Sequence, residues 1–246
     1  FFVAPWQTLV PAIALKDQGF LLNEAGYCLS ALGRLSDAAD PIRAALQASV
    51  RRGPGARVNA ATSADLLAEL HWTLGDIDNA LESADQAVKL ADGTTDMYQR
   101  WSARAFFGAA LHQAGRTKEA GEQFQEGEKL LGVQEVPPRF MYSVCGYWYC
   151  ALLLQHGRFN EVLRRAAQAL EIAKRESWLL ATALDRLSLG RAHLLLSIQP
   201  GGGDFSEARS DLDQGVAGLR DAGMLHHLPY GLLARGELYR HTKEWD

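Results

Sequence analysis

One short phrase recurs four times along the chain, and it constrains the fold more than any other feature of the sequence. The phrase has a Gly in its second place, polar residues after it, and an Ala or Val five residues beyond the Gly. It reads LGRLSDAADPI at 32–42, LGDIDNALESA at 74–84, AGRTKEAGEQF at 114–124 and HGRFNEVLRRA at 156–166. The copies start 40 or 42 residues apart. A phrase that returns at such an interval is typical of a repeat protein.

Small residues recur in step with this phrase. When the Gly of each phrase is taken as position 15 of a 34-residue unit, positions 8, 20 and 27 are small or nearly so throughout. Position 8 holds Gly26, Ala68, Gly108, Cys150, Gly190 and Gly236. Small side chains allow two helices to approach closely. The pattern therefore predicts antiparallel helix pairs, helix A and then helix B, with the Gly of the phrase ending helix A in a left-handed turn.

The composition agrees with an all-α fold, because Ala and Leu are abundant and β-branched residues are scarce. The small-residue pattern, together with the turn signals, places the expected helices. They lie near 19–32, 36–50, 58–74, 78–91, 95–114, 117–131, 139–156, 159–175, 178–197, 205–221 and 227–241.

The pattern resembles the tetratricopeptide repeat, or TPR. The resemblance covers residues 19–246 and implies a superhelical solenoid of antiparallel helix pairs. The expected units are about 19–52, 61–94, 101–134, 143–176, 183–222 and a truncated 229–246. Their spacing exceeds the standard 34 residues, as in the kinesin-light-chain type.

Three parts of the chain depart from the repeat. An insertion with three glycines, 199–204, stands where the fifth unit should have a tight turn. Residues 1–18 are expected to be the end of a preceding helix that packs on the first unit. The sequence begins without Met and stops at Trp245 and Asp246, halfway through a unit, so we expect the natural protein to be longer.

Charge and cysteine content argue against several classes of protein. The net charge is −4, whereas a nucleic-acid-binding protein normally has a basic excess or stripe. No run of 18 apolar residues is present, so no membrane span is expected. Cys28, Cys145 and Cys150 form neither a disulfide framework nor a metal-binding pair, which favours a reduced, cytoplasmic setting.

No catalytic, cofactor or metal site is predicted, so the sequence favours a protein that is not an enzyme. The phosphate-binding motif G-x-x-x-x-G-K-S/T is absent. His226 and His227 are adjacent, and neighbours on a helix point about 100° apart, which makes them a poor chelating pair. Cys145 and Cys150 are interpreted as small core residues rather than nucleophiles, since no spaced His partner accompanies them.

The resemblance also implies where a partner would bind. In TPR folds the A helices line a concave surface, which positions 2, 5, 9 and 12 of each unit face. These positions hold Phe20, Asn23, Tyr27 and Ser30; Thr62, Asp65, Glu69 and Trp72; Ser102, Ala105, Ala109 and His112; Val144, Tyr147, Ala151 and Leu154; Leu184, Leu187, Arg191 and Leu194; and Tyr230, Leu233, Glu237 and Arg240.

Ten of these residues are the candidates for binding a partner. They are Asn23, Tyr27, Asp65, Glu69, Trp72, His112, Tyr147, Arg191, Glu237 and Arg240. The members of the family that clamp a C-terminal carboxylate use Lys and Asn at positions 5 and 9. Here Asp65 and Glu69 would repel a carboxylate. A helical or extended partner with basic and apolar residues fits better.

The aromatic residues Tyr142, Tyr147, Trp148 and Tyr149 leave two interpretations open. They could fill the core between neighbouring units. Alternatively, Tyr147 could project into the groove as a binding anchor, since Tyr combines an apolar ring with a polar tip.

Two functions follow from the sequence. The first is a non-catalytic protein–protein interaction module that binds a protein or peptide on the concave face. The second is the ligand-sensing repeat region of a larger signalling NTPase, because the tail LLARGELYRHTKEWD is similar to the C-terminal repeat arrays of bacterial STAND-type NTPases. The sequence leaves open the partner, the oligomeric state, and binding on the convex face or at loop 199–204 instead.

Overall fold

The computed structural model describes residues 2–4, 6, 8–9, 13–132 and 139–244. These residues form eleven α-helices, one 3₁₀ turn and two short strands. The chain divides into two compact units, which we call unit 1 (Phe1–Arg139) and unit 2 (Phe140–Asp246). The expected all-α fold is confirmed.

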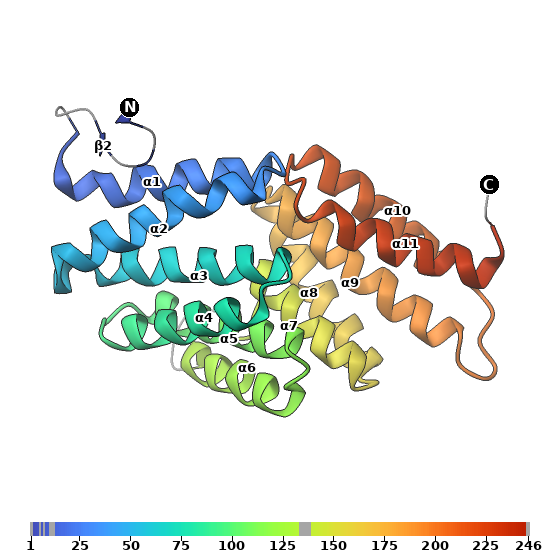
Figure 1. Cartoon of the computed structure of the whole chain (residues 1–246). Helices are drawn as coiled ribbons and strands as arrows, with labels where there is room; N and C mark the ends of the chain where they lie inside the picture. Colours follow the sequence, from blue (N-terminus) through green and yellow to red (C-terminus); the bar gives the residue numbers. More distant parts are fainter. Residues whose placement is uncertain (1, 5, 7, 10–12, 133–138, 245–246) are drawn as a thin grey trace. The chain divides into compact units, whose positions relative to one another are not determined.

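Unit 1 contains the strand pair and six helices, which follow one another in chain order (Figure 1). The strands are β1 (Phe2–Ala4) and β2 (Thr8–Leu9), paired antiparallel. The helices are α1 (Leu15–Ala31), α2 (Leu35–Arg52), α3 (Arg57–Thr73), α4 (Ile77–Asp92), α5 (Met97–Gln113) and α6 (Thr117–Gly132), with the 3₁₀ turn at Pro54–Ala56.

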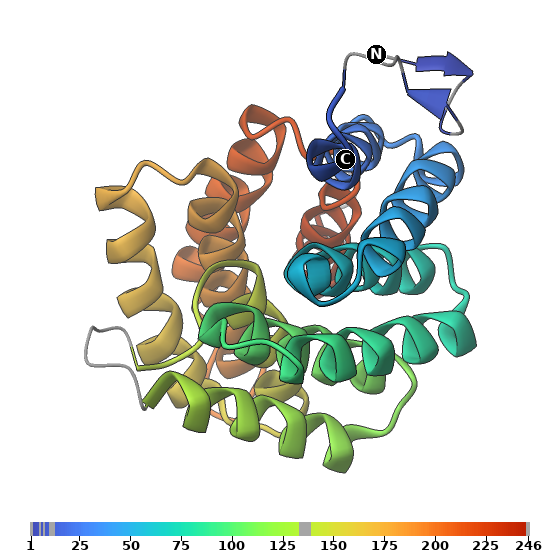
Figure 2. The same cartoon turned by 90° about the vertical axis from the view of Figure 1, so that its left-hand side faces the viewer.

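Unit 2 contains five helices. They are α7 (Ser143–Gln155), α8 (Phe159–Arg175), α9 (Leu179–Ser197), α10 (Ser206–Asp221) and α11 (Leu228–Thr242). Figure 2 shows the same helices, coloured along the sequence, in a view turned by 90°.

The helices pack in the order that the repeat pattern predicts. Each odd-numbered helix packs on the helix that follows it, so α1 pairs with α2, α3 with α4 and α9 with α10. Odd-numbered helices also contact each other within a unit, α1 with α3 and α3 with α5 in unit 1, and α7 with α9 and α9 with α11 in unit 2. The odd-numbered helices are therefore the A helices of the pairs.

Small residues lie where the helices of a pair cross. A Cβ added at Gly190 would lie 2.7 Å from Leu212 Cγ on α10, and one at Gly108 would lie 3.0 Å from the ring of Phe124 on α6. Both neighbours are fully buried. At Gly236 on α11, by contrast, no described atom lies within 4 Å of an added Cβ. At Gly108 and Gly190, side chains of the paired helix therefore leave little room for a Cβ, whereas there is room for one at Gly236.

The glycines of the repeated phrase end four A helices. Gly33, Gly75, Gly115 and Gly157 have φ values of 73°, 82°, 75° and 70°. A side chain at these left-handed φ values would strain the backbone, so glycine occupies them at the lowest free-energy cost. The predicted left-handed turns are confirmed.

The expected helix boundaries hold to within about four residues, and the N-terminal segment is the main correction. Residues 2–4 and 8–9 form strands and not the end of a helix, and α1 begins at Leu15 instead of 19. Between the strands, Trp6 packs against the core cluster that contains Leu29 and Ile42. Trp245 and Asp246, where the sequence stops, lie outside the described residues.

Helix α7 begins later than predicted, at Ser143 instead of 139. Tyr142 is extended and Ser143 has a positive φ of 57°, so the chain turns immediately before the helix. Met141 is buried, and its carbonyl lies so close to Gly146 that a Cβ there would be 2.7 Å away. The segment therefore folds back over the first turn of α7, which prevents an earlier helix start.

Within the described part of the chain, no helix has both the length and the apolar character needed to cross a bilayer.

Candidate functional site: two hollows lined by A helices

Unit 1 has a hollow of about 390 Å³ between α1 and α3. We call it the acceptor hollow, because several of its side chains contain oxygen atoms that can accept hydrogen bonds. Its lining residues are mainly polar and aromatic. They are Phe20, Asn23, Glu24, Tyr27, Asn59, Thr62 and Leu66.

A chain of side-chain hydrogen bonds runs from this hollow into unit 1. The hydroxyl of Thr62, which lines the hollow, is 3.1 Å from Val58 O and 3.1 Å from Gln99 Oε1. Gln99 Nε2 donates to Asp65 Oδ2 over 2.8 Å. Because both neighbours of the Thr62 hydroxyl are acceptors, its proton is directed away from the hollow and its lone pairs remain for the hollow.

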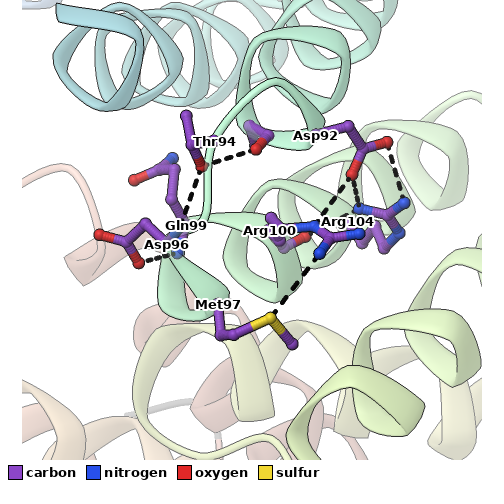
Figure 3. A network of polar contacts seen from close by, with 8 residues as sticks. Asp92, Thr94, Asp96, Met97, Gln99, Arg100 and Arg104 are labelled. Carbon is purple, nitrogen blue, oxygen red and sulfur yellow. Dashed lines mark hydrogen bonds and ion pairs between the residues drawn. The ribbon is translucent and has the colours of Figure 1, made fainter. Parts of the chain in front are cut away.

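The turn between α4 and α5 holds Gln99 in place (Figure 3). Asp96 caps α5, since its Oδ1 accepts from the backbone N–H of Gln99 at 3.0 Å. The hydroxyl of Thr94 accepts from Asp96 N and donates to Ala91 O. Arg104 adds a two-pronged ion pair to Asp92, with distances of 2.9 and 3.0 Å. These contacts hold the first turn of α5, which carries Gln99.

Acidic groups lie in and near the acceptor hollow, and burial alters the pKa of groups around it. Burial raises the pKa of Tyr27, and the charges of Glu69 and Glu24 raise it further. Burial also raises the pKa of Asp65 well above its usual value, although the hydrogen bond from Gln99 opposes that shift. None of the seven lining residues is a Lys, Arg or His.

Unit 2 has a second hollow, of about 330 Å³, between α7, α9 and α11. We call it the apolar hollow. Most of its lining is aliphatic or aromatic, with one basic and one acidic side chain. The residues are Tyr147, Arg191, Leu194, Leu195, Tyr230, Leu233, Ala234 and Glu237.

Tyr147 belongs both to the core and to the wall of the apolar hollow. It is 2% exposed, and its ring meets Trp148 at 4.9 Å and Tyr230 at 6.3 Å between centroids. Burial raises the pKa of its phenol, while a hydrogen bond with Arg191 opposes that shift. Tyr147 is therefore a packed wall residue and not a projecting anchor, and its hydroxyl holds the guanidinium of Arg191 beside the hollow.

A buried carboxyl lies elsewhere on α9, at Asp185. This residue is 2% exposed, its Oδ2 has no hydrogen-bond partner among the residues that the structure describes, and burial raises its pKa to about 8. Its charge contributes, after burial itself, to a pKa of about 12 for the thiol of Cys150. A thiol with such a pKa is almost entirely protonated at neutral pH, and the thiolate is the nucleophilic form. Burial of the thiol thus disfavours nucleophilic chemistry at Cys150.

His226 and His227 are not two neighbours within one helix, contrary to the prediction. His226 precedes α11 and His227 is its N-cap, so the pair does not lie on one helix. The centroids of the two rings are 4.2 Å apart. The absence of a metal and of a cofactor stays a prediction.

The structure brings five of the ten candidate residues to the two hollows. Asn23 and Tyr27 line the acceptor hollow, and Tyr147, Arg191 and Glu237 line the apolar hollow. The other five line neither hollow. Asp65 is buried beneath Thr62 and Gln99, Glu69 lies near Tyr27, Trp72 packs on Phe106, His112 is half-buried in the last turn of α5, and Arg240 is exposed beside Glu237.

Five lining residues were absent from the positions 2, 5, 9 and 12. They are Glu24, Asn59, Leu66, Leu195 and Ala234. Glu24, Leu66 and Ala234 all occupy position 6 of their units, which follows position 2 by one helical turn. Residues four apart share a helix face, so extending the row from position 2 to position 6 would have found these three.

Sequence comparisons return no relative. No protein-family model matches the chain. No curated protein sequence matches it either.

Solved structures with a similar fold were found. The apo form of RapI superimposes with a TM-score of 0.63 at 9% identity, covering 94% of this chain and 87% of RapI. The Rap conjugation gene regulator of plasmid pLS20, in complex with the Phr* peptide, gives 0.60 at 13% identity and covers 96% of this chain and 67% of the regulator.

A putative kinesin light chain of Podosopora anserina with nearly identical TPR-like repeats gives a TM-score of 0.54 at 16% identity, covering 85% of this chain and 98% of that protein. At these identities the similarity concerns the fold alone. The chain therefore has the TPR-like helical-repeat fold of these proteins.

Proposed function

We propose that this chain is a non-catalytic protein–protein interaction module that binds a peptide or an extended segment of a partner protein through its A helices. One observation carries the proposal. In each unit the hollow is walled by A helices, α1 and α3 in unit 1, and α7, α9 and α11 in unit 2. The Rap regulator of pLS20, whose fold is similar, was solved with a peptide bound.

The chemistry of the hollows supports a partner that has basic and apolar residues. The acceptor hollow offers oxygen atoms and negative charge, which favour hydrogen-bond donors and cations. The apolar hollow offers the apolar surface of leucines and tyrosines. Its lining also contains Arg191 and Glu237, which can bind polar groups of a partner. A peptide with a basic residue and an aliphatic residue would complement both kinds of surface.

A pair of leucines in unit 2 tests the proposal. Leu233 is 73% exposed and lines the apolar hollow, whereas Leu179 is 59% exposed and does not. Peptides are selected from a random display library against the full chain, and their Kd values are measured by fluorescence anisotropy. Leu233→Arg, Tyr27→Arg in the acceptor hollow, and the double variant are compared with Leu179→Arg as the control.

We expect every selected peptide to lose about tenfold or more in affinity, roughly 1.4 kcal/mol, with at least one lining variant. The double variant should lose all of the peptides, and Leu179→Arg should bind as the wild type does. Peptides that bind the double variant and the wild type equally would place the binding surface elsewhere, such as at loop 199–204. That loop is organised in part by Asp204, whose Oδ1 accepts from Ser206 N at 2.9 Å.

We also propose a cytoplasmic location, because Cys28, Cys145 and Cys150 are all free thiols. Thiol labelling of the protein isolated from cells under acid quench tests this, since a reducing compartment predicts complete labelling after unfolding.

The structural matches give no support to the alternative function, a sensor region of a STAND-type NTPase. That hypothesis requires a nucleotide-binding domain in the same reading frame, which sequencing of the flanking DNA would reveal or exclude.

A further inference from the structure

We propose that the acceptor hollow of unit 1 is a subsite for a guanidinium group, the side chain of an arginine in the partner peptide. This inference rests on the proposed function and adds the chemical identity of one recognised residue.

The polar atoms of the hollow present acceptors. Asn23 lines the hollow and is 6% exposed, and no donor in the described part of the chain bonds its Oδ1. Thr62 has one hydroxyl proton, which Val58 O and Gln99 Oε1 can both accept, so its lone pairs are available to a ligand. An unpaired buried acceptor costs free energy that a donor-bearing ligand recovers. The hollow therefore favours a ligand that is rich in donors.

The lining of the hollow contains one acid, Glu24 on α1, and its side chain is exposed. Burial raises the pKa of Asp65 well above its usual value and that of Glu69 to about 7, so these two acids of α3 contribute little negative charge to the hollow. With no basic residue in the lining to balance Glu24, a cation is the complementary ligand.

The aromatic residues distinguish between cations. Phe20 and Tyr27 both line the hollow and are 57% and 41% exposed, so part of each ring remains accessible. A guanidinium has five N–H donors in one plane and stacks on aromatic faces, whereas an ammonium is a compact, strongly hydrated charge. Dispersed acceptors beside aromatic rings suit the planar, multi-donor cation better.

The test uses tripeptides, so that it does not depend on the natural partner. The full ¹⁵N-labelled chain is titrated with acetyl-Ala-Arg-Ala-amide and followed by NMR at the amides of Asn23 and Tyr27. The comparison probe contains citrulline, whose neutral urea group has the shape of a guanidinium without its charge. A lysine tripeptide tests the ammonium.

We expect the arginine tripeptide to shift these signals with a Kd at least tenfold lower than that of the citrulline or lysine tripeptide. Glu24→Gln, at an exposed position, should weaken the arginine probe several-fold and leave the citrulline probe unchanged. Glu82→Gln, an exposed acid on α4 outside the hollow, is the matched control with the same change of charge. Asn23→Leu removes the buried acceptor, and Glu24→Gln still decides the matter if that variant does not fold.

Equal binding of arginine and citrulline, or no shift with either, would overturn the guanidinium subsite. A lysine probe that binds as tightly as arginine would overturn the preference for guanidinium. Neither result would contradict the proposed function, because library peptides that depend on Leu233 would still bind unit 2. Library peptides that bind the double variant and the wild type equally, together with a positive arginine titration, would contradict the proposed function and support the guanidinium subsite.

Discussion

The two hollows differ in chemistry although the same kind of helix walls them. The acceptor hollow of unit 1 has Asn23, Glu24 and Thr62 in its lining and lacks a basic side chain there. The apolar hollow of unit 2 is lined by leucines and tyrosines and contains Arg191. Positions 2, 5, 6 and 9 of the A helices contribute to both. The repeat framework therefore determines where a hollow forms, and the side chains at a few positions determine what it can bind.

The largest expected effect tests whether the two hollows are independent. Gly190→Leu should lower the free energy of unfolding by about 3 kcal/mol, because the new side chain meets the buried Leu212 where α9 crosses α10. We expect the apolar hollow to lose its peptides while the arginine tripeptide still binds unit 1. Denaturant titration and the NMR assay measure the two quantities.

Gly236→Leu is the control for this substitution. No described atom lies within 4 Å of an added Cβ at Gly236, so stability should be unchanged or rise by less than about 1 kcal/mol, as expected for a helical Gly that is replaced. Equal destabilisation by the two variants would show that Gly190 is not a packed crossing.

Each unit contains a buried acid, Asp65 in unit 1 and Asp185 in unit 2. Gln99 donates to Oδ2 of Asp65, and among the described residues Asp65 Oδ1 and Asp185 Oδ2 have no hydrogen-bond partner. The pKa of Asp185 is about 8 in the folded chain, against about 3.9 for an exposed Asp. The folded state thus binds more protons between these values, and the free energy of unfolding falls as the pH rises from about 4 through 8.

Asp185→Asn should remove much of this pH dependence. We expect the wild type to lose on the order of 2 kcal/mol between pH 5 and pH 8, and the variant to lose clearly less. Near pH 5 the two proteins should differ little, because Asp185 is then protonated. Parallel pH profiles of urea midpoints for both proteins would show that Asp185 is ionised and solvated in the folded state.

A smaller effect concerns the polar edge of the apolar hollow. Tyr147→Phe removes the hydroxyl that bonds Arg191 and keeps the ring that packs on Trp148 and Tyr230. We expect a loss of about 1 kcal/mol in thermal or chemical unfolding, typical of one hydrogen bond. Binding of the arginine tripeptide to unit 1 should not change. A stability equal to that of the wild type would mean that water replaces the hydroxyl without cost.

The smallest expected difference is between the turns of the two units. Gly75→Ala in unit 1 and Gly157→Ala in unit 2 each place a Cβ at a positive φ, with no described atom within 4 Å. Each should cost about 1 kcal/mol through backbone strain. Melting temperatures that fall by the same amount would show that the units share one framework. Unequal falls in melting temperature would show that the backbones of the two turns, and not only the side chains of the hollows, differ between the units.

Most of the helical framework could be predicted because its causes are local and repeated. The small residues and turn glycines impose the same crossing and the same turn in each repeat, so Gly190 and Gly157 could be assigned without coordinates. The N-terminal strands could not be predicted from a repeat, because residues 1–18 carry none of its signals. The start of α7 was missed because it depends on the carbonyl of Met141 lying over Gly146, which is a tertiary contact.

The candidate site was predictable only in part. Residues of positions 2, 5 and 9 occur in the lining of both hollows, yet Asp65 and Trp72 are covered by neighbouring side chains in unit 1. Polar type at a groove position does not reveal whether another side chain, such as Gln99, occupies the space in front of it. That information belongs to side-chain packing, which a repeat pattern does not encode.

Gly190 and Arg191 are neighbours in the chain with different roles. Gly190 packs against α10, whereas Arg191 lines the apolar hollow. A mutation at Arg191 can alter recognition while the helix crossing beside it is preserved. Over evolutionary time such a protein could acquire new partners by single substitutions, because the residues under selection for folding and those under selection for specificity are different residues. Variation among descendants should then accumulate in the hollow linings while the crossing and turn glycines are retained.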